Sequence, residues 1–457
     1  MALVNFFGAA SGLDTGNLIN ALLEQQRKSR IAPIQKKIET LQNTQSSFSD
    51  LSSKLNKLRD VTSQFREIYG GAISKTASVS DESVLVATPS KGALNTSVSI
   101  NVTQLASNAS VSFNDTFAQL DSKINPSGQT AALNITIGSG NNTETVNLTV
   151  DNNTTVSDLV ANFNQSTDKA VASTVNVGTA TNPQYKIVFN TLNEGTATGS
   201  LAIQDPSALF SGQTVSQATD AILSISGISG SITRDTNSIS DLISGVKLDL
   251  KRVGTTTLSV SSDSEATSGD IKNMVEALND IISYSNQNDL VTTENIDGNS
   301  RAIFGSLSLT SLDESLISSL KLGLSAASIS GGAVNSLADL GITTNRDGSL
   351  RFDDKVFTQS MAKDPSSATK ILSNVGEALA KTGGVIDQFS RFGGLLDTAR
   401  TNTDQEISRM NQRITDIEKI LSRQEETLIA KFSRLEGQIS KMQSQGSYLQ
   451  HILAGLK

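Results

Sequence analysis

Few residues in this chain belong to the types that bind metals or catalyse reactions, and the most metal-like stretch is residues 343–354, TTNRDGSLRFDD. In this stretch Asn345, Asp347 and Gly348 fall near the third, fifth and sixth positions of a calcium-binding EF-hand loop. The first and twelfth positions lack the carboxylate and the bidentate glutamate that such a loop requires. Asn-Arg-Asp-Gly between two apolar residues is typical of a hairpin, so we predict a turn here and no metal site.

No combination of side chains predicts a catalytic site. The single histidine, His451, has leucine and isoleucine neighbours and therefore neither an orienting carboxylate nor a nucleophile beside it. Asp353 and Asp354 are adjacent, so on a strand their carboxylates would point to opposite faces of the sheet. The chain has no cysteine, which excludes thiolate metal sites and cysteine nucleophiles. We expect no catalytic residue, no cofactor and no enzyme activity.

The composition is that of an acidic chain with several domains. A length of 457 residues predicts about three domains. The net charge is -8, and residues 76–266 alone hold 8 Lys and Arg against 16 Asp and Glu, so this block carries the whole net charge. Nucleic acid is therefore a poor partner. We also expect no membrane insertion, because no segment approaches the roughly 20 apolar residues of a span, and no Sec-type signal in the first ten residues.

The first 75 residues have the apolar spacing of two helices. Asp14 is a good N-cap, because its carboxylate can accept the free amides of the first turn. Four apolar residues follow at helical spacing: Leu18, Ile19, Leu22 and Leu23. Pro33 disfavours helical geometry just before it, so we predict that the first helix stops or kinks there. A second, one-sided helix follows, with apolar residues at steps of three, four or seven from Ile34 to Ile68.

The other end of the chain mirrors the first. Apolar residues keep a seven-residue register from Ile407 to Leu428 and continue, slightly shifted, to Leu456. Gly437 and Gly446 lie within this stripe, and each costs about 1 kcal/mol relative to alanine in a helix. We predict a long helix whose last turns need a partner.

The middle of the chain changes from helical to alternating patterns. The clearest predicted strands are 97–102, 134–137, 144–150, 186–189 and 255–260. One short helix is expected within this region, at 154–164, and a longer helical stripe returns at 270–284. These patterns predict an α+β multidomain chain whose terminal helices pair as a coiled-coil or helical-bundle leg and whose inserted, mainly-β domains form a head.

Five segments follow from these patterns: 1–40 and 431–457 as the two arms of a terminal helical domain, 41–75 and 267–430 as a helical leg, and 76–266 as two nested β domains. The stripe from Ile34 to Ile68 suits an internal core and an intersubunit contact equally well. For the extreme ends we favour an interface with another subunit, because terminal segments fray unless something outside them holds them. The predicted interface residues are Leu18, Ile19, Leu22, Leu23, Leu449, Ile452, Leu453 and Leu456.

Several motifs resemble one family in sequence order. FFGAASGLDTGNLINALL at residues 6–23 is similar to the opening of flagellar filament-capping proteins, the hook-associated protein 2 or FliD family. SVSINVTQLA at 97–106, QATDAILSISG at 217–227 and SLADLGITTNRDGSLRFD at 336–353 are similar to later segments of that family. The last of these distinguishes the capping family from flagellin.

The resemblance implies a structural cap at the distal tip of the bacterial flagellum. It implies a homo-oligomeric ring, usually of about five subunits, that retains exported flagellin and promotes its polymerisation. Further implied partners are hook-filament junction proteins, the flagellar type III export apparatus and an export chaperone, with secretion that needs no signal peptide. An alternative is a surface adhesin, a role that could also coexist with capping, or another axial or junction protein of the flagellum without capping activity.

Overall fold

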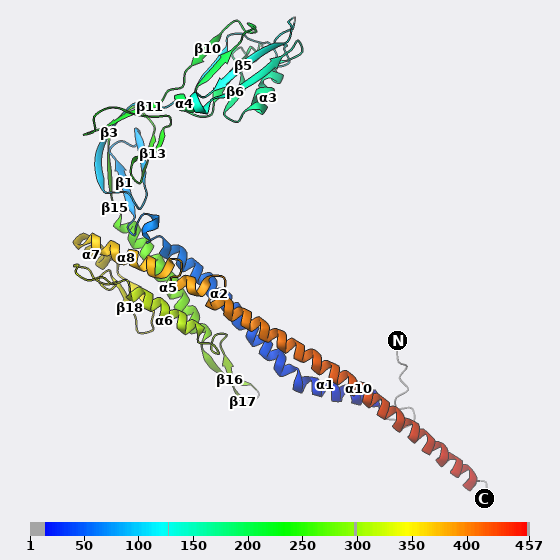
Figure 1. Ribbon diagram of the computed structural model, residues 1–457. Helices are drawn as coiled ribbons and strands as arrows, with labels where there is room; N and C mark the ends of the chain where they lie inside the picture. Colours follow the sequence, from blue (N-terminus) through cyan, green and yellow to red (C-terminus); the bar gives the residue numbers. More distant parts are fainter. Residues whose placement is uncertain (1–13, 127, 297–298, 455–457) are drawn as a thin grey trace. The chain divides into compact units, whose positions relative to one another are not determined.

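The computed structural model describes residues 14–126, 128–296 and 299–454, and the chain divides into two compact units. The helical unit combines the two ends of the chain, residues 1–66 and 268–457 (Figure 1). The β unit is inserted between them and runs from residue 67 to residue 267.

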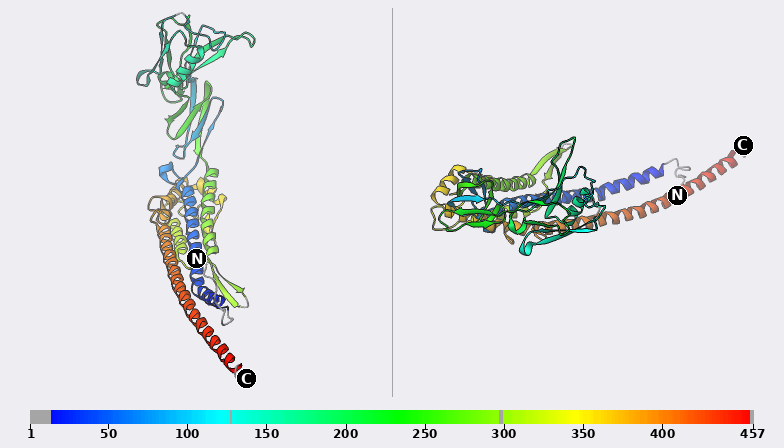
Figure 2. Two further views of the ribbon diagram at one scale, coloured as in Figure 1. Left: turned by 90° about the vertical axis from the view of Figure 1, so that its right-hand side faces the viewer. Right: turned by 90° about the horizontal axis from the view of Figure 1, so that it is seen from above.

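The helical unit is built from long helices and two small hairpins. Its elements are α1 (Thr15–Arg30), α2 (Ala32–Ser63), α5 (Ser264–Asn288), β16 (Val291–Ile296), β17 (Asn299–Phe304), α6 (Leu312–Ser325), β18 (Ile342–Thr344), β19 (Leu350–Phe352), α7 (Asp354–Lys363), α8 (Pro365–Ala380), α9 (Val385–Ser390) and α10 (Leu395–Ala454). Helices α1 and α2 lie side by side with α10 (Figures 1 and 2). The two ends of the chain therefore pair, as predicted.

The junction between α1 and α2 is a kink. The carboxylate of Asp14 accepts the backbone N–H of Asn17 at 3.0 Å, which confirms the predicted N-cap of α1. Ile31, between the two helices, keeps helical angles, and its N–H still donates to the carbonyl of Arg27 at 2.8 Å. Pro33 lies in the first turn of α2, where its missing N–H costs least. The helical path thus bends at the predicted place without unwinding.

The apolar stripe of α2 forms the core of the helical unit. Its buried members are Ile38, Phe48, Leu51, Leu55 and Leu58, and Phe65 follows just after the helix. They pack against α8, α9 and α10 of the same chain. The predicted stripe of α5 is also buried, at Ile271, Met274, Val275, Leu278, Ile281 and Ile282. Most of the stripe from Ile34 to Ile68 is therefore internal, one of the two alternatives that the sequence left open.

The β unit contains almost all the strands. Its elements are η1 (Glu67–Tyr69), β1 (Lys75–Val79), β2 (Leu85–Pro89), β3 (Thr96–Gln104), β4 (Ser110–Phe113), β5 (Ala131–Ile137), η2 (Gly140–Asn142), β6 (Glu144–Val150), α3 (Val156–Ser166), β7 (Ala170–Asn176), β8 (Tyr185–Thr191), α4 (Gly195–Thr198), β9 (Leu201–Gln204), β10 (Gln213–Ser216), β11 (Ala221–Ile225), β12 (Ile232–Arg234), β13 (Ser238–Ile243), β14 (Val246–Leu250) and β15 (Gly254–Ser262). Every strand predicted from the sequence is present.

These strands form two separate cores. In the first, a sheet of order β1-β15-β3-β11-β12 and a sheet of order β13-β14-β2 enclose one apolar cluster that contains no aromatic ring. In the second core, the sheets β10-β4-β8-β7 and β6-β5-β9 and helix α3 enclose one apolar cluster. Within this cluster the ring of Phe163 on α3 meets the ring of Phe189 edge to face, with 4.9 Å between the ring centres. Phe113 stacks on Phe210 at 3.6 Å in the same cluster. The insertion thus contains two packed apolar clusters, and its predicted division into two nested domains stays a prediction.

The metal-like stretch at 343–354 is a hairpin. Strands β18 and β19 pair antiparallel, and the N–H of Asn345 donates to the carbonyl of Ser349 at 2.8 Å. Gly348 has a φ of 84°, a left-handed angle that favours glycine. Within the part of the chain that the structure describes, no three acidic or histidine side chains are grouped as metal ligands.

The predicted fold class is confirmed: long helices at both ends pair, and mainly-β domains are inserted between them. Among the described residues, no helix is both long enough and apolar enough to cross a membrane.

Candidate assembly interface

The seam between α1 and α10 buries half of the predicted interface residues of α1. Ile19 and Leu23 are only 4% and 2% exposed, and they form one cluster with Ile31 and Leu421. Partly buried residues of α10 complete this cluster: Ile414, Ile417, Leu428, Ile429 and Phe432. Ile19 and Leu23 are therefore covered by the chain's own last helix.

The other half of the predicted set on α1 faces outward. Leu18 is 60% exposed and Leu22 is 44% exposed. Because residues one apart on a helix lie about 100° from each other, the four apolar residues form two faces, one sealed inside the chain and one open. Leu18 and Leu22 remain candidates for a contact with another molecule.

Polar side chains also lie in this seam. The Nε of Arg27 lies 3.2 Å from Oε2 of Glu418 on α10, an ion pair in which both side chains are nearly half exposed. Gln26 and Gln424 each bury a carboxamide oxygen without a described hydrogen-bond partner, on the two facing helices. A buried oxygen without a partner costs about 1–3 kcal/mol, so this seam is less stable than its apolar cluster alone would make it.

Beyond Phe432, α10 is largely uncovered by described residues, and only Glu436 and Ile439 are partly buried there. Of the described side chains from Ser433 to His451, none is buried. The large apolar side chains exposed there are Leu435, Met442, Tyr448 and Leu449. Leu449 was predicted as an interface residue and is 59% exposed. Ile452 and Leu453 lie in the last turn of α10, but their side chains, like Leu456 as a whole, fall outside the described residues.

The two glycines of this uncovered segment do not interrupt it. Helix α10 runs through Gly437 and Gly446, and a Cβ added at either position would meet none of the described residues within 4 Å. Neither glycine is therefore required by close packing. Each lowers the intrinsic stability of the helix by about 1 kcal/mol relative to alanine, which suits a segment that orders against another surface.

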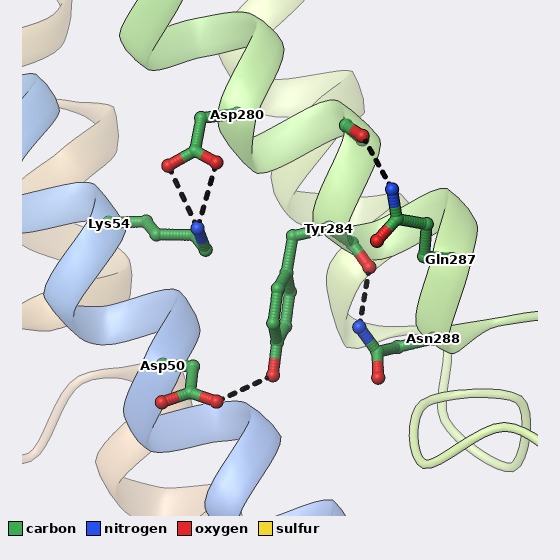
Figure 3. A network of polar contacts seen from close by, with 7 residues as sticks. Asp50, Lys54, Asp280, Tyr284, Gln287 and Asn288 are labelled. Atoms are coloured by element: carbon green, nitrogen blue, oxygen red, sulfur yellow. Dashed lines mark hydrogen bonds and ion pairs between the residues drawn. The ribbon is translucent and has the colours of Figure 1, made fainter.

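A polar network locks α2 to α5 (Figure 3). The ammonium of Lys54 lies 2.8 and 2.9 Å from the two carboxylate oxygens of Asp280 and 5.1 Å from the ring centre of Tyr284. The hydroxyl of Tyr284 donates to Asp50 at 2.8 Å. Burial, helped by the hydrogen bond to Asp50, raises the pKa of Tyr284 above its ordinary value. The phenol therefore stays protonated and holds α5 against α2 at neutral pH.

The same network continues to a feature that we did not predict. Ser47 of α2 lies 2.6 Å, hydroxyl to hydroxyl, from Ser306, which follows the hairpin of β16 and β17. This two-stranded hairpin exposes Leu290, Val291, Ile303 and Phe304 along or beside its strands. The sequence carries a hairpin signal here, Asp-Gly at 297–298 between two runs of alternating residues, which could have revealed it.

Two family models match the chain. Residues 11–109 match the model described as flagellar hook-associated protein 2 N-terminus, and residues 218–444 match the model of its C-terminus. The unmatched stretch 110–217 contains all of the second, aromatic β core except Ala109 and Ala218.

Individual relatives agree with these matches. The chain is 26% identical over 450 residues to the A-type flagellar hook-associated protein 2 of Pseudomonas aeruginosa, covering 89% of this chain and 90% of the relative. It is 28% identical over 248 residues to the B-type protein of Pseudomonas aeruginosa, and this match spans 53% of the chain and about half, 51%, of that relative.

One solved structure shares the fold. The flagellar cap protein FliD of Escherichia coli, domains D1-D2-D3, superposes with a TM-score of 0.62 at 22% identity, covering 78% of this chain and 99% of that one. At this identity the likeness shows the fold alone.

Proposed function

The chain belongs to the family of flagellar hook-associated protein 2, and from this premise we propose that it caps the distal tip of the bacterial flagellar filament. In this role it forms a homo-oligomeric ring, a pentamer, that retains exported flagellin and promotes its ordered polymerisation. No catalytic step is needed, because insertion of each flagellin can draw on binding free energy.

One observation supports this proposal more than any other: the chain carries an apolar surface on its terminal helices that its own described residues do not cover. Leu18 and Leu22 on α1, and Leu449 on the end of α10, are each more than two-fifths exposed. Burying one leucine side chain contributes about 1.5–3 kcal/mol, so three such contacts provide a strong driving force for docking. A second subunit or the filament wall is the expected cover.

The remaining partners follow from the proposed role. Self-association places several acidic β units near one another, and their like charges repel unless the helical units hold the ring together. Delivery to the tip requires the flagellar type III export apparatus and an export chaperone, and seating requires the hook-filament junction proteins or the filament itself. The chain is then secreted and resides at the filament tip.

The proposal is tested in a strain that lacks its filament cap. Wild-type chain should restore swimming, normal filaments and low flagellin in the medium. Replacing Leu18, Leu22 and Leu449 together by serine should shorten the filaments and release flagellin at an unchanged protein level, because these side chains contribute little to the fold.

The matched control replaces a buried leucine of the same helix. Leu23→Ser should lower the thermal stability and the amount of protein, because its side chain is 2% exposed. Normal filaments with the triple serine variant would contradict a seating role for the exposed stripe. Wild-type chain that restores surface attachment but not filament growth would favour an adhesin over a cap.

A further inference from the structure

The kink between α1 and α2 opens a groove against α10. The groove has a volume of about 660 Å³ and lies between the start of α2 and the segment of α10 around residue 413. A second hollow of about 480 Å³ adjoins the groove and shares Pro33 and Lys37 with it. The helical path bends here because Pro33 disfavours a straight helix. At the bend, the side chain of Ile31 is buried in the seam between α1 and α10.

The floor of the groove is apolar. Ile34 on α2 faces Met410 and Ile417 on α10, and all three side chains are half-buried. Met410 and Ile417 are seven residues apart, which is two helical turns or about 10 Å along the axis. The floor therefore runs parallel to both helices and can accept the apolar face of a third.

The rim of the groove is positively charged. Arg30, Lys37 and Arg413 line it and are exposed, and no acidic residue lines either hollow. Lys28 and Lys36 add two further cations at the second hollow. None of these five cations forms an ion pair with any residue that the structure describes, whereas neighbouring Arg27 is paired with Glu418.

This concentration of charge is unlike the rest of the chain. Residues 27–37 contain five Lys and Arg and no acidic residue, although the chain as a whole has a net charge of -8. Like charges placed this close repel one another, and a bound anion relieves the repulsion.

From the apolar floor and the unpaired cations, we infer that this groove binds an acidic amphipathic helix of another protein. The apolar side chains of that helix occupy the floor between α2 and α10, and its carboxylates pair with Arg30, Lys37 and Arg413. The inference concerns the chain in solution and stands whether or not the chain caps a filament.

The uncovered end of α10 from a second copy does not have this chemistry. From Ser433 to His451 it carries Arg434 and Lys441 against Glu436 alone, so its net charge has the same sign as the groove. An extended polyanion does not match either, because it leaves the apolar floor unused.

A designed peptide tests the inference on the full-length protein. The probe is a fluorescent, end-capped peptide of about 18 residues made of Leu, Ala, Gln and Glu, with leucines on one helical face and glutamates flanking it. Binding is followed by fluorescence anisotropy. We expect saturable binding that weakens about tenfold or more when the salt concentration rises from about 50 to about 300 mM. A scrambled peptide of the same composition should bind at least about tenfold more weakly, because it has no apolar face.

Charge reversal at the rim localises the site. The triple variant Arg30→Glu, Lys37→Glu and Arg413→Glu should weaken peptide binding by at least about tenfold. Its matched control reverses Lys355, Lys370 and Lys381, which are exposed on the same unit outside the groove, and should bind within about twofold of wild type. Met410→Gln, at the floor, should weaken binding about threefold or more. Circular dichroism checks folding, and the corresponding glutamine variants replace the glutamates if the first variant does not fold.

Each of these results would overturn the inference: no binding of the probe at about 100 µM protein, equal binding of the scrambled peptide, equal loss in the control triple variant, or tighter binding of duplex DNA than of the peptide. Loss of self-association in the rim variant, with no competition from the peptide, would assign the groove to a contact between copies and would also overturn it.

Discussion

The two halves of α10 carry the same kind of apolar stripe but meet different surroundings. Up to Phe432 the stripe packs against α1, α2 and α9, and Leu421 is completely buried. From Ser433 to His451 none of the described side chains is buried, although leucine, methionine and tyrosine recur there. A helical stripe in a sequence therefore establishes that a face will be covered, but not whether the cover comes from the same chain.

The largest effect is expected from breaking the sealed half. Leu421→Ala removes a side chain with no exposed surface and should destabilise the seam by about 2–5 kcal/mol. Hydrogen exchange in α1 should accelerate accordingly. The neighbouring Ile420 is 45% exposed, so Ile420→Ala should change the free energy of the opening that permits amide exchange by less than about 0.5 kcal/mol. Similar effects of the two variants would show that the seam between α1 and α10 does not hold in solution.

A smaller effect, of opposite sign, is expected in the open half. Gly437→Ala and Gly446→Ala should each stabilise the helix by about 1 kcal/mol, because the added methyl groups meet no atom of the described residues. Amide exchange from 433 to 451 should slow, while exchange in the sealed half stays unchanged.

A glycine in a packed helix supplies the contrast. A Cβ at Gly376 in α8 would lie 3.0 Å from the backbone nitrogen of Arg66, so Gly376→Ala should destabilise the helical unit instead. If amide exchange from 433 to 451 stays unchanged after both glycine substitutions, this segment is already held against another surface before the proposed cap assembles.

The smallest effect concerns the ion pair at the edge of the seam. A double-mutant cycle with Arg27→Ala and Glu418→Ala should give a coupling energy of about 0.2–1 kcal/mol, because both partners are well exposed to water. The coupling should decrease at high salt. A coupling well above this range would show that the pair, rather than the apolar cluster, aligns α1 with α10.

The sequence was most informative where apolar residues repeat with a single period, that of a strand or that of a helix. Strand β6 has the same bounds as the predicted strand 144–150, and the kink lies at the predicted proline. The family predicted from the motifs is confirmed by both family models. The order of strands in the sheets could not be predicted from the sequence. Strand β3, for example, lies between β15 and β11, which are both far from it along the chain. Alternation shows which residues share a face, but not which strand pairs with which.

For the predicted interface, too, the sequence shows which residues are apolar but not what each of them contacts. Leu18 and Ile19 are both apolar and adjacent, and one is open while the other is sealed. The position of α10 decides which of the two side chains is buried. That position depends on contacts between residues nearly 400 apart in the chain, such as Arg27 with Glu418. The predicted role of these residues in assembly stays a prediction, as does the five-part division of the chain.

The first and last strands of the β unit are neighbours: Lys75 of β1 pairs with Ser262 of β15, and the N–H of Asp263 donates to the carbonyl of Ser74 at 2.8 Å. Once this unit folds, its entry and exit are fixed close together. For the helices on either side, an insertion of roughly 200 residues then acts as a short tether, which lowers the entropic cost of their pairing by about 2–3 kcal/mol. The insertion can therefore vary in length or content between descendants of one ancestor while the helices still find each other.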